Sequence, residues 1–318
     1  MLLRLLIAIG LEAVSAEAAP LAVRIGYFPN VTHAQGVIGS HTSRQHQGWF
    51  ETRLGSDVSV RWLPFNAGPS AIEGIFAGSV DLTYVGPNPA LNGYIRSEGE
   101  EIRIIAGAAE GGAALVVAGN SGIRTPADFR GRRVGTPQLG NTQDVAARSW
   151  LRAQGFRVTL TGGEVNVLPA ANPDLLQLFT QGRIDAAWTV EPWVSRLEQE
   201  VGARVFLEQG DAITTVLVAS ASFLSKHASV AERIRKAHVE LTSWITAHPA
   251  EAMELTRAGL TTETRREVPG ALMRSAWKRL RFTAKVEPER FKVLVEDARS
   301  VGLLRRSVPL ERLFPPAP

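Results

Sequence analysis

Small polar residues follow several apolar stretches of this chain, and they have the clearest potential for chemistry. The run Gly140-Asn141-Thr142-Gln143-Asp144 separates a short strand-like stretch from an obvious helix. Other strand-like stretches are followed in the same way by Phe28, Pro29, Asn30, Thr32 and His33, by Asn66 to Ser70, by Gly86, Pro87 and Asn88, and by Glu191, Pro192 and Trp193. Four of these turns are expected to open a helix.

The chemistry available to such turns is the binding of an anion. A helix N-terminus has four N–H groups without a partner and the positive end of the helix dipole, which together stabilise a negative charge by ~0.3–1 kcal/mol when exposed. Several termini that meet in one cleft could hold a sulfonate, nitrate, carboxylate or phosphate without any Arg or Lys. Helix capping alone would also explain residues such as Asn66 and Thr142, so both interpretations stay open.

Other kinds of site are not supported. The chain has no cysteine, which excludes disulfides, thiolate metal ligands and a cysteine nucleophile. His33, His41 and His46 are spaced so that they do not share one helical face, and we expect no metal site. No G-x-S-x-G, P-loop, dinucleotide fingerprint or paired-acid motif is present. The pattern therefore favours a binding protein without cofactor over an enzyme.

The elements that must position these turns alternate between strand and helix, which predicts an α/β fold with mainly parallel strands. Expected strands are 23–27, 58–63, 82–85, 103–106, 114–118, 133–136, 164–168, 184–189 and 216–220. Expected helices are 34–54, 70–77, 125–129, 142–154 and 174–181, followed by a tail that is helical from about residue 230.

Two α/β units and a helical tail predict a two-lobed protein. The chain should cross between the lobes near 108–113 and 206–212, where the sequence is loop-like. We expect a first lobe of residues 20–110 with 210–318 and a second lobe of 111–209. Clefts between domains and the carboxyl ends of strands are preferred places for small ligands.

The first 19 residues are expected to be a signal peptide cleaved near residue 18. Arg4 begins an apolar stretch, and Ala16-Glu17-Ala18 fits the cleavage pattern. Export without a lipid anchor predicts a periplasmic protein. From Arg257 to Arg312 the chain has 14 Lys/Arg against 7 Asp/Glu at helical intervals. We interpret these charges as solvated helix faces and expect no nucleic-acid partner.

Three long motifs resemble the periplasmic substrate-binding proteins of ABC importers for sulfonates, taurine and nitrate. They are "FNAGPSAIEGIFAGSVDLTYVGPNPAL", "RVGTPQLGNTQDVAARSWLRAQGF" and "GRIDAAWTVEPWVSRL", and "HPAEAMEL" in the tail fits as well. The resemblance implies a type II periplasmic binding protein fold that closes on an oxyanion between its lobes. It also implies a membrane permease with its ATPase as partner, and a monomer.

The resemblance implies ligand contacts from both lobes. The candidates in the first lobe are Asn30, Gly68, Pro87 and Asn88, and those in the second are Asn141, Thr142, Gln143, Trp188 and Glu191, with Thr214 and Thr215 at the rim.

Two of these candidates bear on the identity of the ligand. Trp188 could form an aromatic wall for an organic tail, which favours an alkanesulfonate or taurine-like sulfonate over nitrate. Glu191 would repel an anion, so we expect it to turn away and pair with an arginine such as Arg148 or Arg196. The alternatives are a receptor for nitrate, bicarbonate or a thiamine-precursor-like ligand, and an enzyme of the same fold. Known enzymes of that fold depend on cysteines, which this chain lacks.

Overall fold

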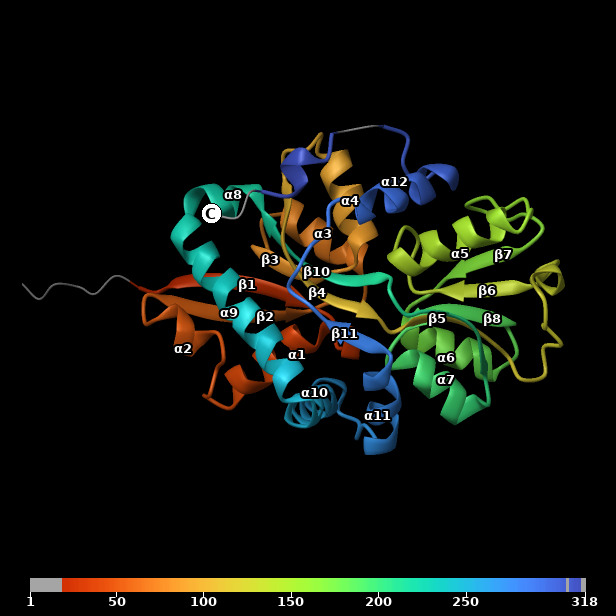
Figure 1. The fold of residues 1–318 in the computed structure, drawn as a ribbon, viewed down its shortest axis with the longest axis horizontal. Helices are drawn as coiled ribbons and strands as arrows, with labels where there is room; N and C mark the ends of the chain where they lie inside the picture. The colour runs from red at the N-terminus through yellow and green to blue at the C-terminus, as the bar shows by residue number, and fades with distance from the viewer. Residues whose placement is uncertain (1–18, 307–308, 316–318) are drawn as a thin grey trace, which may run out of the picture.

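The computed structural model describes residues 19–306 and 309–315, which form two lobes, each built around one β-sheet (Figure 1). The prediction of a two-lobed α/β fold is therefore confirmed. The expected signal peptide lies outside the described residues. Within the described ranges, no helix has the length and apolar character needed to cross a membrane.

The larger lobe, lobe 1, contains a six-stranded sheet in the order β11-β4-β10-β3-β1-β2. Its strands are β1 (Leu21–Tyr27), β2 (Val58–Pro64), β3 (Leu82–Val85), β4 (Ile102–Gly111), β10 (Ile213–Ser220) and β11 (Leu280–Phe282). β1 pairs in parallel with β2 and β3, whereas β10 is antiparallel to both of its neighbours. The sheet is thus mixed rather than mainly parallel, because β4 and β10 carry the chain to and from the other lobe in opposite directions.

Helices cover both faces of this sheet. They are α1 (Ala34–Arg44), α2 (Glu51–Leu54), α3 (Gly68–Phe76), α4 (Pro87–Arg96), α8 (Ala221–Lys226), α9 (Ala228–Ala247), α10 (Pro249–Thr264), α11 (Gly270–Lys278) and α12 (Arg290–Ser300). Side chains alternate along each strand between the two faces. Leu217 and Ala219 of β10 pack with α1, α9 and α10, and Val216 and Val218 pack with α3, α4 and α12.

Lobe 2 is a five-stranded sheet in the order β7-β6-β8-β5-β9. Its elements are β5 (Ala113–Val117), β6 (Arg133–Thr136), α5 (Thr142–Ala153), β7 (Asn166–Pro169), α6 (Asn172–Thr180), β8 (Ala186–Val190), α7 (Trp193–Val201) and β9 (Arg204–Gln209). α5 covers one face of the sheet, while α6 and α7 cover the other. The connections after β6, β7 and β8 therefore open helices on the side of lobe 2 that faces lobe 1 (Figure 1).

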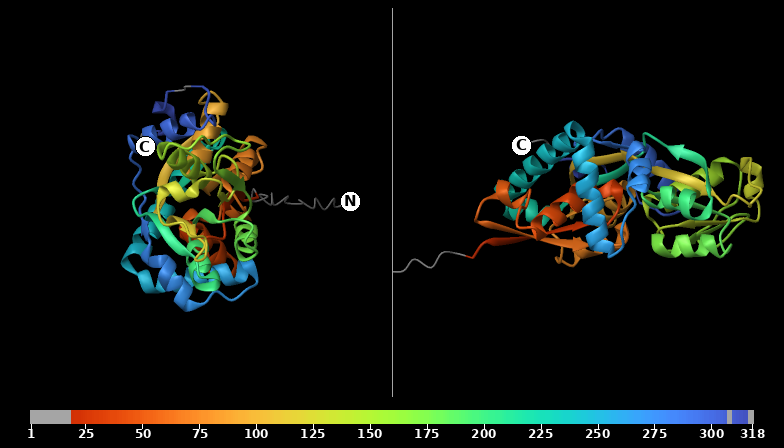
Figure 2. Two further views of the ribbon diagram at one scale, coloured as in Figure 1. Left: turned by 90° about the vertical axis from the view of Figure 1, so that its right-hand side faces the viewer. Right: turned by 90° about the horizontal axis from the view of Figure 1, so that it is seen from below.

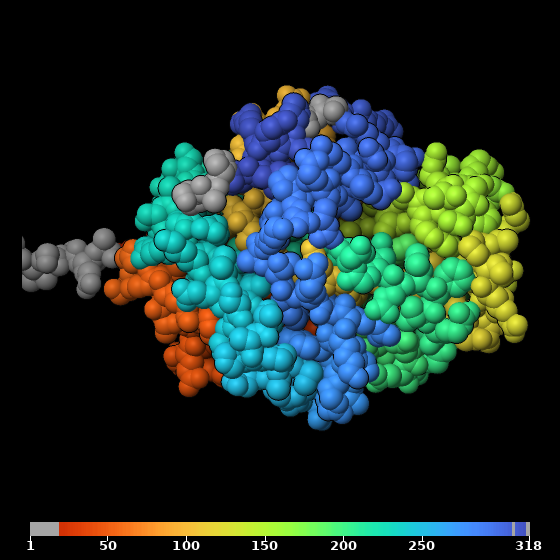
Figure 3. Space-filling view, viewed as in Figure 1, coloured from red at the N-terminus to blue at the C-terminus, as the bar shows by residue number. Residues whose placement is uncertain are grey.

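Two short connections join the lobes. β4 passes into β5 through Gly111 and Gly112, both at positive φ, and β9 passes into β10 through Gly210–Ala212. The right-hand view in Figure 2 shows the lobes side by side along the long axis, with the C-terminal segment on lobe 1. In Figure 3 this segment, in blue, runs across the front of lobe 1 and meets lobe 2 at both ends.

Three predicted elements differ from the structure. The helix expected over 34–54 is two helices, because the chain turns at His46 in a left-handed conformation. The two crossings expected as loops are mostly strand: residues 108–111 belong to β4, residue 113 to β5 and residues 206–209 to β9. The tail expected to be helical includes the strand β11, whose backbone pairs with the edge of β4.

Candidate ligand-binding site

A small polar cavity lies between the lobes and receives side chains from both. We call it the inner cavity; its volume is about 20 Å³, enough for about one water molecule. None of its lining residues carries a formal charge: they are Phe28, Asn30, Thr32, His33, Asn66, Gly86, Pro137, Asn141, Gln143, Asn172, Val190 and Thr214. A larger polyatomic head group would enter only if side chains or lobes moved apart.

Three helices begin at this cavity, as the sequence predicts for an anion site. Gly86 is the N-cap of α4, and Pro87 at the first turn needs no hydrogen-bond acceptor for its nitrogen. Asn141 is the N-cap of α5, and Asn172 opens α6 with Pro173 beside it. The positive ends of three helix dipoles therefore point towards one small volume, which favours a negative charge there.

Three asparagines of the inner cavity are oriented as hydrogen-bond donors. Asn30 Oδ1 accepts from Trp193 Nε1 at 3.1 Å, and Asn141 Oδ1 accepts from the Gln143 N–H at 2.9 Å. Asn172 Oδ1 accepts from Thr189 Oγ1 at 2.7 Å. Because each carbonyl oxygen is engaged within the protein, each side chain has its NH₂ group left to donate, and none of these groups has a partner among the described residues.

His33 adds a neutral donor to the same cavity. It is 2% exposed, and burial lowers its pKa to about 3, so the imidazole is neutral at physiological pH. Its Nδ1 accepts from the backbone N–H of Phe28 at 3.4 Å, and the two rings are stacked. With Nδ1 as acceptor, the proton is on Nε2, so this residue of the cavity wall keeps one N–H donor and no positive charge.

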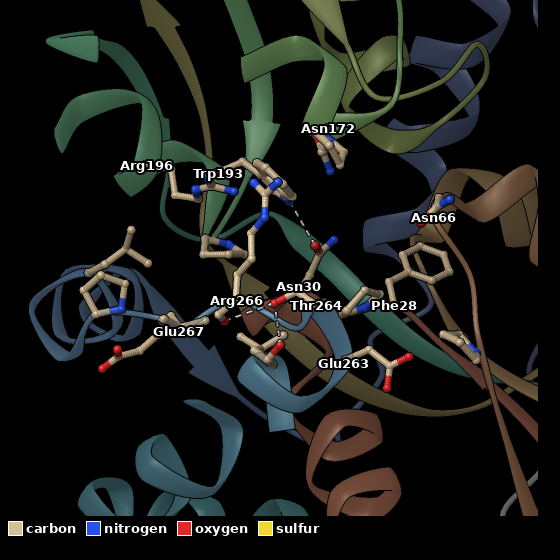
Figure 4. Close-up of a pocket in the computed structure, with 18 of the residues that line it drawn as sticks. Phe28, Asn30, Asn66, Asn172, Trp193, Arg196, Glu263, Thr264, Arg266 and Glu267 are labelled. Carbon is tan, nitrogen blue, oxygen red and sulfur yellow. Dashed lines mark hydrogen bonds between the residues drawn. The ribbon is translucent and has the colours of Figure 1, made fainter. Parts of the chain in front are cut away.

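A second, larger cavity adjoins the first and shares Phe28, Asn30, Asn66 and Asn172 with it. We call it the outer cavity; its volume is about 780 Å³. Figure 4 shows Trp193 above Asn30 and Phe28 beside them, with residues of the α10–α11 connection below. Aromatic and apolar side chains dominate its walls, namely Phe28, Phe65, Trp193, Leu260, Val268 and Leu272. The two cavities together offer a polar end and an apolar body.

The lobes are in direct contact around this site. The Trp193–Asn30 hydrogen bond joins α7 of lobe 2 to lobe 1. On the other side of the cleft, Thr142 Oγ1 accepts from the backbone N–H of Asn88 at 3.4 Å. Ser149 on α5 also donates to Asp297 on α12 at 2.5 Å. The structure is therefore a closed arrangement in which contacts flank the cavities on both sides.

Glu191 is turned away from the cavity and paired with an arginine, but the predicted partner is wrong. Its carboxylate accepts from Ser195 and from Arg279, 2.9 Å away, which follows α11 of lobe 1. Arg148 instead pairs with Asp144 inside lobe 2, and Arg196 pairs with Glu200. Burial raises the pKa of Glu191, while the hydrogen bonds from Ser195 and the charge of Arg279 oppose that shift.

Arg279 links the lobes close to the chain crossings. Besides Glu191 it contacts Glu198 at 2.9 Å and Glu208 at 3.6 Å, both in lobe 2. Its backbone carbonyl accepts from the N–H of Gly112 at 2.8 Å. A single side chain of lobe 1 thus forms ion pairs with three carboxylates of lobe 2.

Trp188 is not an aromatic wall of either cavity. It is 1% exposed within the core of lobe 2, near Trp150, and its Nε1 donates to Gln209 at 2.9 Å. The aromatic residue that lines the outer cavity is Trp193, which opens α7. Trp188 lies within β8, so it points into a sheet face that α5 covers.

Thr215 is also not at the cavity, although its neighbour Thr214 is. The ladder between β10 and β4 is irregular at these two residues: Thr215 pairs with Ala109, and Thr214 is outside the pairing. Thr214 Oγ1 donates to the Ala109 carbonyl at 3.1 Å, while Thr215 is fully buried.

The remaining predicted residues divide into those at the cavity and those beside it. Asn30, Asn141 and Gln143 line the inner cavity. Thr142, Pro87 and Asn88 form the contact between α5 and α4, where both side-chain polar atoms of Asn88 are buried without a partner. Gly68 lines neither cavity and packs closely against Pro89, where a Cβ atom would clash.

Several residues of the two cavities are not among the ligand contacts expected from the sequence. Trp193, at the start of α7, is among the turn residues noted from the sequence but not among the expected contacts, and Asn172, at the start of α6, is in neither set. Asn172 follows β7 and opens a helix, so the same pattern could have identified it. Arg266 lies in the connection between α10 and α11, for which the sequence has no such signal. Among the described residues, no group of three His, Cys, Asp or Glu side chains is placed to hold a metal ion.

Comparison with known proteins confirms the resemblance read from the sequence. The model of the NMT1-like family matches residues 16–259. An Escherichia coli (strain K12) protein, provisionally named as an aliphatic sulfonates-binding protein, is 29% identical over 209 residues. That match covers 65% of this chain but only 60% of the relative, less than two thirds of its length. The taurine-binding periplasmic protein of the same strain is 24% identical over 198 residues, 61% of this chain and 60% of that protein.

A solved structure confirms the fold. The alkanesulfonate-binding protein SsuA from Xanthomonas axonopodis pv. citri, bound to MOPS, matches with a TM-score of 0.77 at 19% identity. The match covers 94% of this chain and 99% of that one. The two lobes and their connections thus have the periplasmic binding protein arrangement.

Proposed function

The chain belongs to the NMT1-like family, and we propose that it is the periplasmic receptor of an ABC importer for a small organic anion. The ligand is an alkanesulfonate or a similar organic sulfonate, bound between a lobe of residues 20–110 with 210–318 and a lobe of 111–209. The relatives named for aliphatic sulfonates and taurine support this class of ligand. The receptor passes its ligand to a membrane permease and catalyses no reaction.

The observation that carries this proposal is the set of neutral donors in the inner cavity. Asn30, Asn141 and Asn172 come from three separate loops, and each has its carbonyl oxygen occupied by a protein donor. Together with His33 and three helix N-termini they provide donors without a charged side chain. A sulfonate has three equivalent acceptor oxygens and no proton to donate, so it matches this arrangement.

The outer cavity supports an organic tail. An ion as small as nitrate or bicarbonate would leave the apolar walls of the outer cavity without a partner, whereas an alkyl or aromatic tail would bury them. Closure then stabilises the complex, because Trp193 and Asn30 come from different lobes and both line the outer cavity. The ligand shifts the population from an open form to a closed form in which side chains of the inner cavity have moved apart, because the present volume of about 20 Å³ holds only about one water molecule.

A neutral heteroaromatic compound, such as a thiamine-precursor-like pyrimidine, is the second candidate. The aromatic walls formed by Phe28, Phe65 and Trp193 favour it. It would need acceptors as well as donors in the inner cavity, where three asparagine carbonyls are already engaged.

Replacement of Asn141 by aspartate separates these candidates. Asp caps a helix as well as Asn does, so Asn141→Asp keeps the bond to the Gln143 N–H and should leave the melting temperature nearly unchanged. It exchanges a donor for a carboxylate in the inner cavity. Binding of an organic sulfonate should therefore weaken by at least about tenfold, since a charge-assisted hydrogen bond is lost and a like charge is added.

The measurement starts with thermal shifts of the mature protein against ethanesulfonate, pentanesulfonate, benzenesulfonate, taurine, nitrate, bicarbonate and a neutral aminopyrimidine. A ligand at ~100 times its dissociation constant adds roughly 2.7 kcal/mol of stability. Titration calorimetry then compares wild type with Asn141→Asp. A flat response to every sulfonate, together with a shift by the pyrimidine that Asn141→Asp retains, would replace the anion by the neutral ligand.

A further inference from the structure

The geometry points to a ligand whose tail carries a second acidic group, recognised by Arg266 in the outer cavity. This inference rests on the proposed function and narrows its ligand class to organic sulfonates that are dianions. Five charged side chains line the outer cavity: Arg196, Glu200, Glu263, Arg266 and Glu267. The ion pairs and hydrogen bonds that these side chains form within the protein determine which of their charges can interact with a ligand.

Three of the five are neutralised within the protein. Arg196 donates to both carboxylate oxygens of Glu200 at 2.6 and 3.1 Å, and its guanidinium stacks over the Trp193 ring at 4.8 Å. Glu263 accepts from Tyr27 Oη at 2.8 Å and pairs with Arg44. Because these groups hold one another, none offers an uncompensated charge to a ligand.

Arg266 is different, because its guanidinium has no ion pair or hydrogen bond among the described residues. It follows Arg265, which ends α10 in a left-handed conformation, and only its backbone carbonyl is engaged, by Thr264 Oγ1 at 3.3 Å. Figure 4 shows the Arg266 side chain extending across the cavity towards Trp193. The carboxylate of Glu267 points away from it in the same view. The cavity therefore has one unpaired cation directed into it, beside an aromatic face.

The unpaired guanidinium of Arg266 should favour some ligand tails over others. A carboxylate or sulfonate can accept two parallel hydrogen bonds from the guanidinium, which combine charge with a fixed geometry. A plain alkyl or phenyl tail gains only apolar contact. An ammonium tail, as in taurine, would meet the positive charge of Arg266 and find the carboxylates of Glu200 and Glu263 already engaged. Glu267, which has no ion pair among the described residues, points away from Arg266, so an ammonium group held near Arg266 would not reach it (Figure 4). A second acid at the far end of the tail is thus favoured over both.

Matched pairs of compounds test the inference. Titration calorimetry compares benzenesulfonate with 4-sulfobenzoate, and propanesulfonate with 3-sulfopropanoate, so that each pair differs only by the second acid. Wild type should bind the dianion of at least one pair about fivefold more tightly in low salt, as expected for a partly exposed ion pair. The preference should shrink when salt is raised, because screening acts on exposed charges.

Arg266→Gln should abolish the preference for the dianion and leave the affinity for the monosulfonate within about twofold. Arg265→Gln is the matched control, because it removes the adjacent arginine, which does not line the cavity. Equal affinities of wild type for both members of both pairs, or a preference that survives in Arg266→Gln, would overturn this inference while leaving the proposed function intact. Failure of all four compounds to bind would instead remove the proposed function as well.

Discussion

Replacing Gly86 with alanine should prevent full closure of the lobes without harming either lobe. Gly86 is the N-cap of α4, with φ −64° and ψ 154°, a conformation that alanine adopts freely. A Cβ atom there would lie 2.4 Å from Thr142 Oγ1, which belongs to lobe 2. Within lobe 1 the nearest contact is Pro89 at 3.7 Å, an ordinary van der Waals distance. The only conflict thus arises across the interface.

The size of the effect follows from this overlap. Carbon–oxygen contacts below about 3 Å are not tolerated, so the two lobes must separate by several tenths of an ångström or the side chain of Thr142 must rotate away. Overpacking of this kind costs about 1–3 kcal/mol. Since the cost falls on the closed form, the affinity for a ligand that needs closure should fall by about 5- to 150-fold.

Calorimetric titration with the best sulfonate from the screen measures the affinity, and small-angle scattering measures closure. The unliganded variant should melt within a few degrees of wild type. Thr142→Ala removes the clashing hydroxyl, so the double variant should recover part of the loss caused by Gly86→Ala. Gly270→Ala is the control, because its methyl group would meet only the tip of Arg274. Unchanged affinity of Gly86→Ala, or strict additivity with Thr142→Ala, would refute the reasoning.

Three further predictions concern the interface and the core. Trp193→Phe removes the hydrogen bond to Asn30 but keeps an aromatic wall, so ligand affinity should fall about two- to tenfold by calorimetry; an unaltered value would argue against this bond as a closing contact. Arg279→Gln leaves Glu191 buried without its counter-charge and should lower the free energy of unfolding in urea by about 3 kcal/mol, with recovery when Glu191→Gln is added. Burial lowers the pKa of His238 to about 4, below its unfolded value of about 6.5, so the unfolded chain takes up this proton first. This group alone should lower the free energy of unfolding by about 3 kcal/mol between pH 6.5 and pH 4. His33, whose pKa burial lowers to about 3, adds a similar loss over the same range. His238→Gln should therefore remove about half of the pH slope, and a full wild-type slope in that variant would contradict this.

The amino-acid sequence alone is enough to predict the layout of the fold. Short, mostly buried strands such as 82–85 and 133–136 match β3 and β6, because the turn residues that bound them are a local signal. The position of Asn30, Asn141 and Gln143 at the inner cavity could be predicted because a helix opening is a local signal: the capping residue and the residues that line the cavity lie within a few positions.

Only the tertiary structure determines which of two similar residues, close together in the sequence, faces the cleft. Thr214 and Thr215 are neighbours of the same type, yet an irregularity of the β10–β4 ladder leaves Thr214 outside the pairing and at the inner cavity, while Thr215 pairs with Ala109. Trp188 and Trp193 are five residues apart, yet one is covered by α5 and the other opens a helix at the cleft. Arg279 reaches Glu191 across 88 residues of chain, and Arg266 reaches the cavity from a connection with no local motif. Such contacts depend on how two lobes and a C-terminal segment pack, and pairing over that distance leaves no periodicity in the sequence.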